Sequence, residues 1–295
     1  MVNEHRLHKI PYNEYLLFDF DKLTNPKDRE QFVNDNERIA FAEAMNLPSN
    51  DPIFYDKEIT YKVFGKYYFR DVIRVNRECD ISDFISFVTA HPRFICKPID
   101  GGCGVGIKII NTTDIPSYQS LFDSLVDEYD GKCIAEELIV QAKVIEEFHP
   151  GSVNTVRMPT IRFDDRVDVI HPFFRAGQGK SITDNAGSGG IICPLDSNGI
   201  VVAAADEFGN SFTIHPDTKK ELIGFQMPRW DEAVELVKEL ALFVPTNRYC
   251  SWDLALTENG WALVEANAKG QFVWQYATHI GFRDELKLIM KELGL

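Results

Sequence analysis

The sequence lacks any long run of apolar residues. No stretch of about 18 such residues occurs, which excludes a helix that spans a membrane. The N-terminus, Met1-Val2-Asn3-Glu4-His5-Arg6, also lacks the apolar segment of a signal peptide. We therefore expect a cytoplasmic protein without a membrane partner.

Basic residues are scarce as well. The 295 residues include 31 lysines and arginines against 45 aspartates and glutamates, for a formal net charge of −14. This excess of negative charge argues against DNA, RNA or an anionic membrane surface as a partner, because their phosphates would be repelled. A polyanionic ligand must therefore meet a local group of basic side chains.

The cysteines lack the paired C-x-x-C spacing of metal sites. They are scattered, so neither a zinc site nor a disulfide framework is indicated. We expect most of them to be small buried residues, and Cys103 to be exposed because glycines flank it. The six are Cys79, Cys96, Cys103, Cys133, Cys193 and Cys250.

Helical and extended patterns alternate along a chain that is 44% hydrophobic, enough for a sizeable core. Apolar spacing predicts helices over residues 27–46, 115–129, 229–243 and 281–293. Strand-like patterns cover residues 94–97, 106–110, 133–135, 155–163, 167–174 and 199–204. The sequence therefore predicts an α+β fold.

A glycine-rich segment follows one predicted strand and its terminal Lys97. Glycine backbone can turn N–H groups toward an anion, although a flexible hairpin turn would have the same composition. Residues 101–106 have the length of a Walker A motif, but Ile107-Lys108 follows instead of lysine and a hydroxyl residue. The G-x-G-x-x-G spacing of Rossmann folds is not met either, since Ile107 stands where the third glycine should be. The glycines are Gly101, Gly102, Gly104 and Gly106.

A hairpin near the C-terminus carries three hard oxygen ligands. Residues 251–256 and 261–267 flank a Glu258-Asn259-Gly260 turn, with Asp253 on the first strand and Glu265 and Asn267 on the second. Carboxylate and amide oxygens suit Mg²⁺, which commonly also binds substrate phosphate. The alternative is a solvated polar face of the hairpin.

Taken together, these segments resemble the ATP-grasp superfamily over about residues 56–271. Its elements occur in order: Asp56-Lys57, Lys97, the loop 101–106 as a lid, Glu136-Glu137-Leu138-Ile139 as an adenine hinge, and the three oxygen ligands. The segment from His149 to Arg157 is similar more narrowly to the sugar-transfer-associated ATP-grasp group, found among bacterial polysaccharide and natural-product genes.

The resemblance implies roles for individual residues. Lys57 and Lys97 would bind α- and β-phosphate oxygens, and Glu136 or Glu137 would accept from the adenine amino group, with Ile139 supplying backbone contacts. Asp253, Glu265 and Asn267 would hold Mg²⁺. Arg157, Arg175 and Asn185 would act on the transferred phosphoryl group or line the acceptor site. Ser152, Asn154 and Glu147 are alternatives for the ribose.

The resemblance also implies an architecture and an activity. We expect two α/β subdomains that clasp ATP between antiparallel sheets, with an N-terminal segment at 1–75, a lid subdomain at 76–139 and a C-terminal subdomain at 140–295. The implied activity is ATP-dependent ligation of a small carboxylate to an amine, in an ADP-forming reaction. A phosphotransferase acting on a hydroxyl, a non-catalytic ATP-binding regulator, and a homodimer are the alternatives left open.

Overall fold

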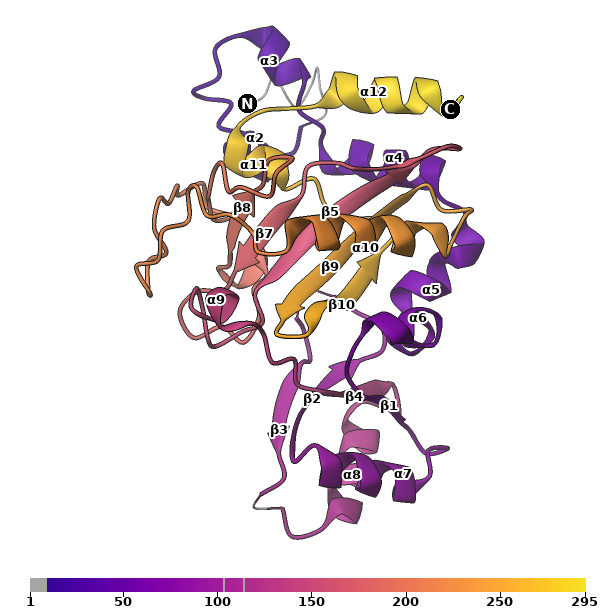
Figure 1. Ribbon diagram of the computed structural model, residues 1–295. Coiled ribbons are helices and arrows are strands. Elements are labelled where there is room, and N and C mark those ends of the chain that lie inside the picture. The colour runs from indigo at the N-terminus through magenta and orange to yellow at the C-terminus, as the bar shows by residue number, and fades with distance from the viewer. Residues whose placement is uncertain (1–9, 103, 114) are drawn as a thin grey trace.

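The computed structural model describes residues 10–102, 104–113 and 115–295, so Cys103 and the N-terminal residues discussed above lie outside the described residues. One sheet is small, with four antiparallel strands in the order β1-β4-β2-β3. Helices α7 and α8 pack on one of its faces at the lower end of the molecule (Figure 1). These elements are β1 (Val72–Val75), α7 (Ile81–Ala90), β2 (Arg93–Pro98), β3 (Lys108–Asn111), α8 (Tyr118–Glu128) and β4 (Cys133–Glu137).

The second sheet is larger, in the order β10-β9-β5-β7-β8, with β6 paired to β5. Helix α10 lies across one face (Figure 1), where Trp252 and Leu254 of β9 are buried beside Val237. Because side chains alternate along a strand, Asp253 faces the opposite side. The elements are α9 (Lys143–Glu146), β5 (Thr155–Arg162), β6 (Val167–Val169), β7 (Phe173–Ala176), β8 (Ile191–Pro194), α10 (Trp230–Leu242), β9 (Tyr249–Thr257) and β10 (Gly260–Asn267).

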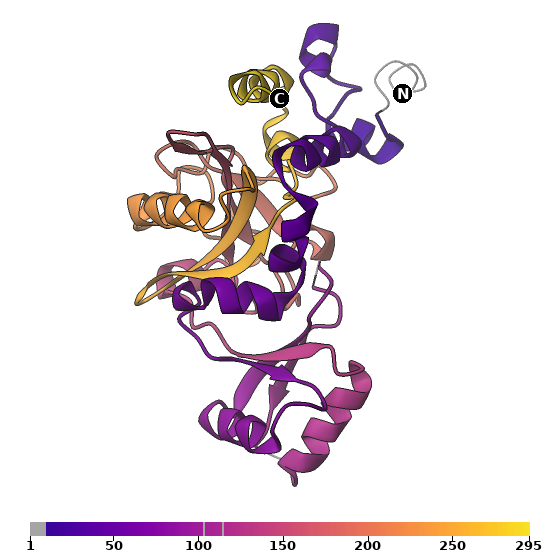
Figure 2. The same cartoon turned by 90° about the vertical axis from the view of Figure 1, so that its right-hand side faces the viewer.

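The N-terminal and C-terminal helices meet at the end of the large sheet that is remote from the small one (Figures 1 and 2). Phe41 of α4 packs there against Phe272, and Phe272 against Phe282. Helices α5 and α6 continue the chain from this end toward the small sheet. The elements are α2 (Tyr12–Leu17), α3 (Pro26–Glu30), α4 (Asp35–Met45), η1 (Pro48–Asn50), α5 (Asp51–Tyr55), α6 (Lys57–Phe64), η2 (Gly65–Tyr67), α11 (Trp274–Thr278) and α12 (Arg283–Glu292).

Three expected elements differ from the structure. The predicted strand over residues 167–174 is two strands, β6 and β7, because the backbone turns between them at His171, whose φ is 45°. The predicted helix over residues 27–46 is two helices, because Asn34 starts a new helix with a capping box: its side chain accepts from the Glu37 N–H at 3.0 Å, and Glu37 accepts from the Asn34 N–H. The predicted strand over residues 199–204 is wrong. Val201 and Ile200 form only isolated bridges, to Leu195 and Gln226, so no continuous partner strand lies beside this segment.

Within the described ranges, no helix is long and apolar enough to cross a membrane. Strand β1 pairs with β4, so the small sheet begins at Val72. The division at residues 75 and 139 stays a prediction. Four of the five described cysteines are buried, and Cys79 is partly exposed.

Candidate active site

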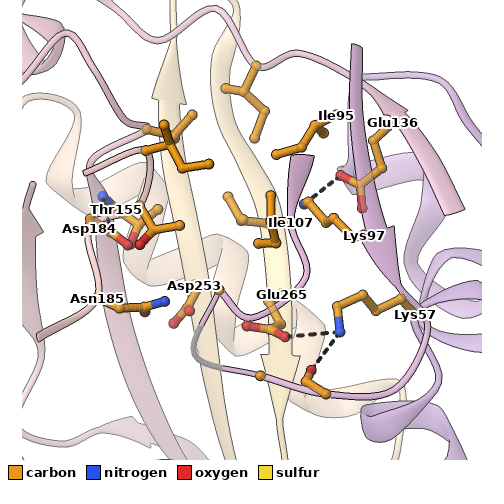
Figure 3. Close-up of a pocket in the computed structure, with 18 of the residues that line it drawn as sticks. Lys57, Ile95, Lys97, Ile107, Glu136, Thr155, Asp184, Asn185, Asp253 and Glu265 are labelled. Carbon is orange, nitrogen blue, oxygen red and sulfur yellow. Dashed lines mark hydrogen bonds and ion pairs between the residues drawn. The ribbon is translucent and has the colours of Figure 1, made fainter. Parts of the chain in front are cut away.

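A pocket lies between the two sheets, closed on one side by the glycine loop (Figure 3). It lies on the face of the large sheet opposite α10, so the polar side of β9 and β10 forms its floor. Most predicted site residues line it: Lys57, Lys97, Gly101, Gly102, Gly104, Glu136, Glu137, Ile139, Arg175, Asn185, Asp253 and Glu265. Arg157, Gly106 and Asn267 are not among the lining residues.

The small sheet contributes a buried group of charges. Lys97 Nζ donates to Glu136 Oε2 at 2.9 Å, and Arg70 Nε donates to the same oxygen at 3.0 Å. Burial by itself would raise the pKa of Glu136, but the two neighbouring cations outweigh it and lower the pKa to about 2. Glu136 therefore stays ionised and holds Lys97 against the pocket wall. Arg70 was missed by sequence reasoning, since no motif surrounds it.

Adjacent glutamates of β4 face opposite sides of the sheet, because side chains alternate along a strand. Glu136 points into the pocket (Figure 3), and its contacts with Lys97 and Arg70 both use Oε2. The Glu137 carboxylate accepts instead from the Asp71 N–H at 3.1 Å and lies 3.9 Å from His91 Nδ1. Glu136 is thus the side chain of the pair available to a ligand in the pocket.

Lys57 joins the glycine loop to the large sheet. It begins helix α6, which Asp56 caps, and its Nζ donates to the Gly101 carbonyl at 2.8 Å while lying 3.9 Å from Glu265 Oε1. Burial lowers the pKa of Lys57, and the charge of Glu265 partly opposes this. Farther along the loop, a Cβ on Gly104 would lie 3.0 Å from Thr183 Cγ2. The loop therefore contacts both walls of the pocket.

Two arginines converge on Asp253. Arg157 binds it with both ends of its guanidinium, Nε to Oδ1 at 2.5 Å and Nη2 to Oδ2 at 2.6 Å. Arg175 Nη2 donates to Oδ2 at 2.7 Å. Burial opposes ionisation of Asp253, but the arginines lower its pKa. Because Oδ2 accepts two hydrogen bonds and Oδ1 only one, Oδ1 keeps a lone pair for a further ligand.

A β-bulge places the other two predicted oxygen ligands, Glu265 and Asn267, on the same face as Asp253. Leu263 pairs with Leu254, whereas Glu265 pairs with Asp253, so Val264 is the extra residue. Without the bulge Glu265 would face the α10 side, since a shift of one residue exchanges the faces of a strand. Asn267 pairs with Ser251 on the Asp253 face, and its buried Nδ2 has no hydrogen-bond partner among the described residues.

The loop from Gly177 to Gly190 supplies the remaining wall. Asp184 Oδ2 accepts from the N–H of Thr155 at 2.9 Å and from its hydroxyl, and Asn185 Oδ1 accepts from Arg175 Nη1 at 3.3 Å. Figure 3 shows Thr155, Asp184 and Asn185 opposite Lys97 and Glu136. Thr155 and Asp184 were missed, although Asp184 directly precedes a predicted residue.

The three alternatives for a ribose contact do not line the pocket. Ser152 and Asn154 are buried in a separate hydrogen-bond network, and Glu147 forms an ion pair with Lys220. The long insertion after the hinge thus turns away from the pocket.

Comparison with known proteins decides the family. The model of the sugar-transfer associated ATP-grasp family matches residues 36–291. The chain belongs to this ATP-grasp family. Solved structures agree on the fold: the D-alanine–D-alanine ligase from Bacillus anthracis has a TM-score of 0.52 and 14% identity over 91% of this chain and 77% of its own. No curated protein matches the chain.

A second similar structure is the ATP-grasp ligase PsnB, solved in complex with a minimal precursor, Mg and ADP. Its TM-score is 0.51 at 14% identity, over 88% of this chain and 67% of that one. The D-alanyl-alanine synthetase A from Vibrio cholerae has a TM-score of 0.52 at 10% identity, over 85% of this chain and 68% of that one. At these identities the likeness shows the ATP-grasp fold alone.

Proposed function

We propose that this ATP-grasp protein is an ATP-dependent, ADP-forming ligase that joins a small carboxylate to an amine. The observation that carries the proposal is the division of charge across one pocket. Lys57 and Lys97 lie on one side of it, opposite Asp253 and Glu265 of the large sheet (Figure 3), and Arg175 of β7 also lines it. A triphosphate needs cations along its length and a charge-neutralising group at its γ-phosphate, and this pocket offers both.

The hinge and the lysines would bind the nucleotide. Residues 137–139 line the pocket together with Ile95 and Ile107, which would form an apolar slot for adenine, with Glu136 Oε1 as the acceptor for its amino group. Lys57 and Lys97 would bind phosphate oxygens as point charges. The glycine loop, already held by Lys57, would exclude water from the phosphates.

The hard-oxygen set fits Mg²⁺. Asp253 keeps a lone pair on Oδ1, Glu265 lies beside it, and Asn267, two residues further along the same face of β10, would offer its amide oxygen. We therefore assign Asp253, Glu265 and Asn267 as the ligands. The bound ion would neutralise charge on the triphosphate.

The reaction itself would depend mainly on positioning. Arg175, which lines the pocket, would orient and stabilise the γ-phosphoryl group while the substrate carboxylate attacks it, forming an acyl phosphate and releasing ADP; Arg157, which does not line the pocket, would act through Asp253. An amine then attacks the acyl carbon and phosphate leaves. Asn185, which accepts from Arg175, would line the acceptor side of the pocket. The family's description, which names an association with sugar transfer, favours an amino sugar as one substrate, with an amino acid as the alternative.

The test is ³¹P NMR of the protein with Mg-ATP, with and without a metabolite extract fractionated into acidic and amine pools. We expect ADP and free phosphate only when both pools are present. A new phosphomonoester would show a phosphotransferase instead, and ATP binding without turnover under every condition would show a regulator.

Replacing Lys57 by methionine is expected to weaken Mg-ATP binding roughly tenfold or more, because a charge-assisted hydrogen bond contributes about 1.5–3 kcal/mol. Titration calorimetry with Mg-AMP-PNP measures this change. The matched control is Lys62→Met on the same helix, where the exposed lysine forms an ion pair with the partly buried Glu58. Equal affinities for the two variants would contradict the role of Lys57.

A further inference from the structure

A buried polar network lies behind the loop 177–190, outside the pocket that the proposed function uses. His149, Ser152 and Asn154 come from the segment that precedes β5, and His215 comes from a loop 60 residues later in the chain. His215 is fully buried, and the other three are at most 6% exposed. Burying several polar side chains is costly unless each finds a partner, so their partners indicate what the network holds.

Both histidines bind the start of the loop. His149 Nε2 donates to the Gly179 carbonyl at 3.2 Å, and His215 Nε2 donates to the Gly177 carbonyl at 2.8 Å. Carbonyl oxygens only accept, so each Nε2 carries a proton. His215 Nδ1 accepts from the backbone N–H groups of residues 217 and 218, which makes its ring neutral. Burial lowers the pKa of His215, in agreement with this form.

Each ring has one local and one remote contact. The Nδ1 atom of His149 binds Ser152 Oγ at 2.9 Å, three residues away, just as Nδ1 of His215 binds its own turn. The Nε2 atoms alone reach the loop 177–190. The local contacts shape the turns that carry the histidines, and the remote contacts hold the loop.

The loop backbone fits closely against this network. The Gly177 N–H donates to Asn154 Oδ1 at 3.0 Å. A Cβ on Gly177 would lie 2.2 Å from Ser152 Oγ and 2.4 Å from His149 Nδ1, so only glycine allows the approach. The path of the chain is therefore set at Gly177, two residues after Arg175.

The far end of the loop enters the pocket. Asp184 accepts from Thr155, and Asn185 accepts from Arg175, so both residues are anchored to β5 and β7. The loop is thus held at Gly177 and Gly179 by the two histidines and at its tip by the strands. Without the histidine contacts, the start of the loop keeps the bonds from the Gly177 N–H to Asn154 Oδ1 and from the Gly179 N–H to Asp217 Oδ2 at 2.7 Å, so the histidines supply the attachment through the two loop carbonyls.

We propose that His149 and His215 are positioning residues that hold the loop 177–190 so that Asp184 and Asn185 face the acceptor side of the pocket. This role rests on the proposed ligase function for its catalytic consequence. The two histidines would therefore affect how the pocket holds the second substrate and the phosphoryl group. Nucleotide binding should stay unchanged, because the hinge and the two lysines touch neither histidine.

Two matched double variants separate the local from the remote contacts. In H149N/H215N the amide oxygen can replace Nδ1, but the shorter side chain does not reach the loop. In H149Q/H215Q the amide nitrogen can occupy the place of Nε2 and donate to the loop carbonyls. Amide hydrogen exchange read by mass spectrometry over residues 178–187 reports loop order, and calorimetry with Mg-AMP-PNP reports nucleotide binding.

We expect exchange in the loop to be about tenfold faster in H149N/H215N, because two hydrogen bonds are lost. H149Q/H215Q should restore the wild-type rate, and both variants should bind Mg-AMP-PNP as the wild type does. With the two substrate pools present, the asparagine variant should release phosphate more slowly at unchanged KM for ATP, and the glutamine variant should recover.

Two outcomes would overturn the proposal: unchanged loop exchange in H149N/H215N, or equally fast exchange in H149Q/H215Q, which would show a general loss of packing. Loss of Mg-AMP-PNP binding in the asparagine variant alone would also overturn it. Failure of the wild type to bind Mg-AMP-PNP would instead contradict the proposed function, and the exchange data would still decide the role of the histidines.

Discussion

Glu265→Gln is expected to lower the rate of ATP-dependent phosphate release roughly 100-fold to 1000-fold, since loss of a metal ligand removes several kcal/mol of charge stabilisation. The fold should be retained, because the carboxylate is partly exposed and its ion pair with Lys57 is long at 3.9 Å. Calorimetry should also show that Mg²⁺ no longer tightens ATP binding, which gives a readout independent of turnover.

The matched control for this variant is Glu258→Gln, at the exposed turn of the same hairpin, where the side chain accepts from the Lys143 N–H. It should retain both the rate and the Mg²⁺ dependence. Near-normal turnover in Glu265→Gln would show that the metal is held elsewhere.

Glu136→Gln is expected to lower the free energy of unfolding by about 3–5 kcal/mol, because it leaves Lys97 and Arg70 without their buried counter-charge. The side chains of Glu136 and Arg70 are only 3% and 2% exposed, so water cannot replace the lost charge. Denaturant titration monitored by tryptophan fluorescence measures the change. Glu137→Gln, its half-exposed neighbour, should change stability by less than about 1 kcal/mol.

The difference in unfolding free energy between the wild type and Glu136→Gln should depend on pH. The folded protein keeps Glu136 ionised down to a pKa of about 2, whereas an unperturbed glutamate takes up a proton near 4.5. The unfolded chain therefore binds more protons between these values, and the stabilisation by Glu136 falls as the pH falls from about 4.5 toward 2. The gap between wild type and Glu136→Gln should narrow over the same range. A constant gap would contradict the low pKa.

Much of the candidate site could be predicted from the sequence because its residues occur in short contiguous patterns. Lys97 ends an apolar strand beside four glycines, and the residues from Glu136 to Ile139 end another strand. Such local patterns depend on the chain within a few residues, and the α+β fold follows from the same periodicities. The ATP-grasp family follows from their order.

Other parts of the site depend on contacts between distant segments. Arg70 lies in no motif and meets Glu136 only because β1 pairs with β4. Asp184 gains its place through Thr155, on a strand 29 residues earlier. The sequence contains both residues without indicating that they meet.

The hairpin of β9 and β10 combines features that the local sequence determines with one that only the tertiary structure decides. The turn at residues 258–260 and the alternation of Glu265 with Asn267 are local, so the sequence by itself determined a hairpin with these two oxygen-bearing side chains on one face of its second strand. Whether that face also carries Asp253 depends on the register, and the regular register set by the turn would put Glu265 on the α10 side. Only the tertiary structure, through the bulge at Val264, brings the carboxylates together, because Leu263 must stay in the core beneath α10 while Glu265 turns to the pocket.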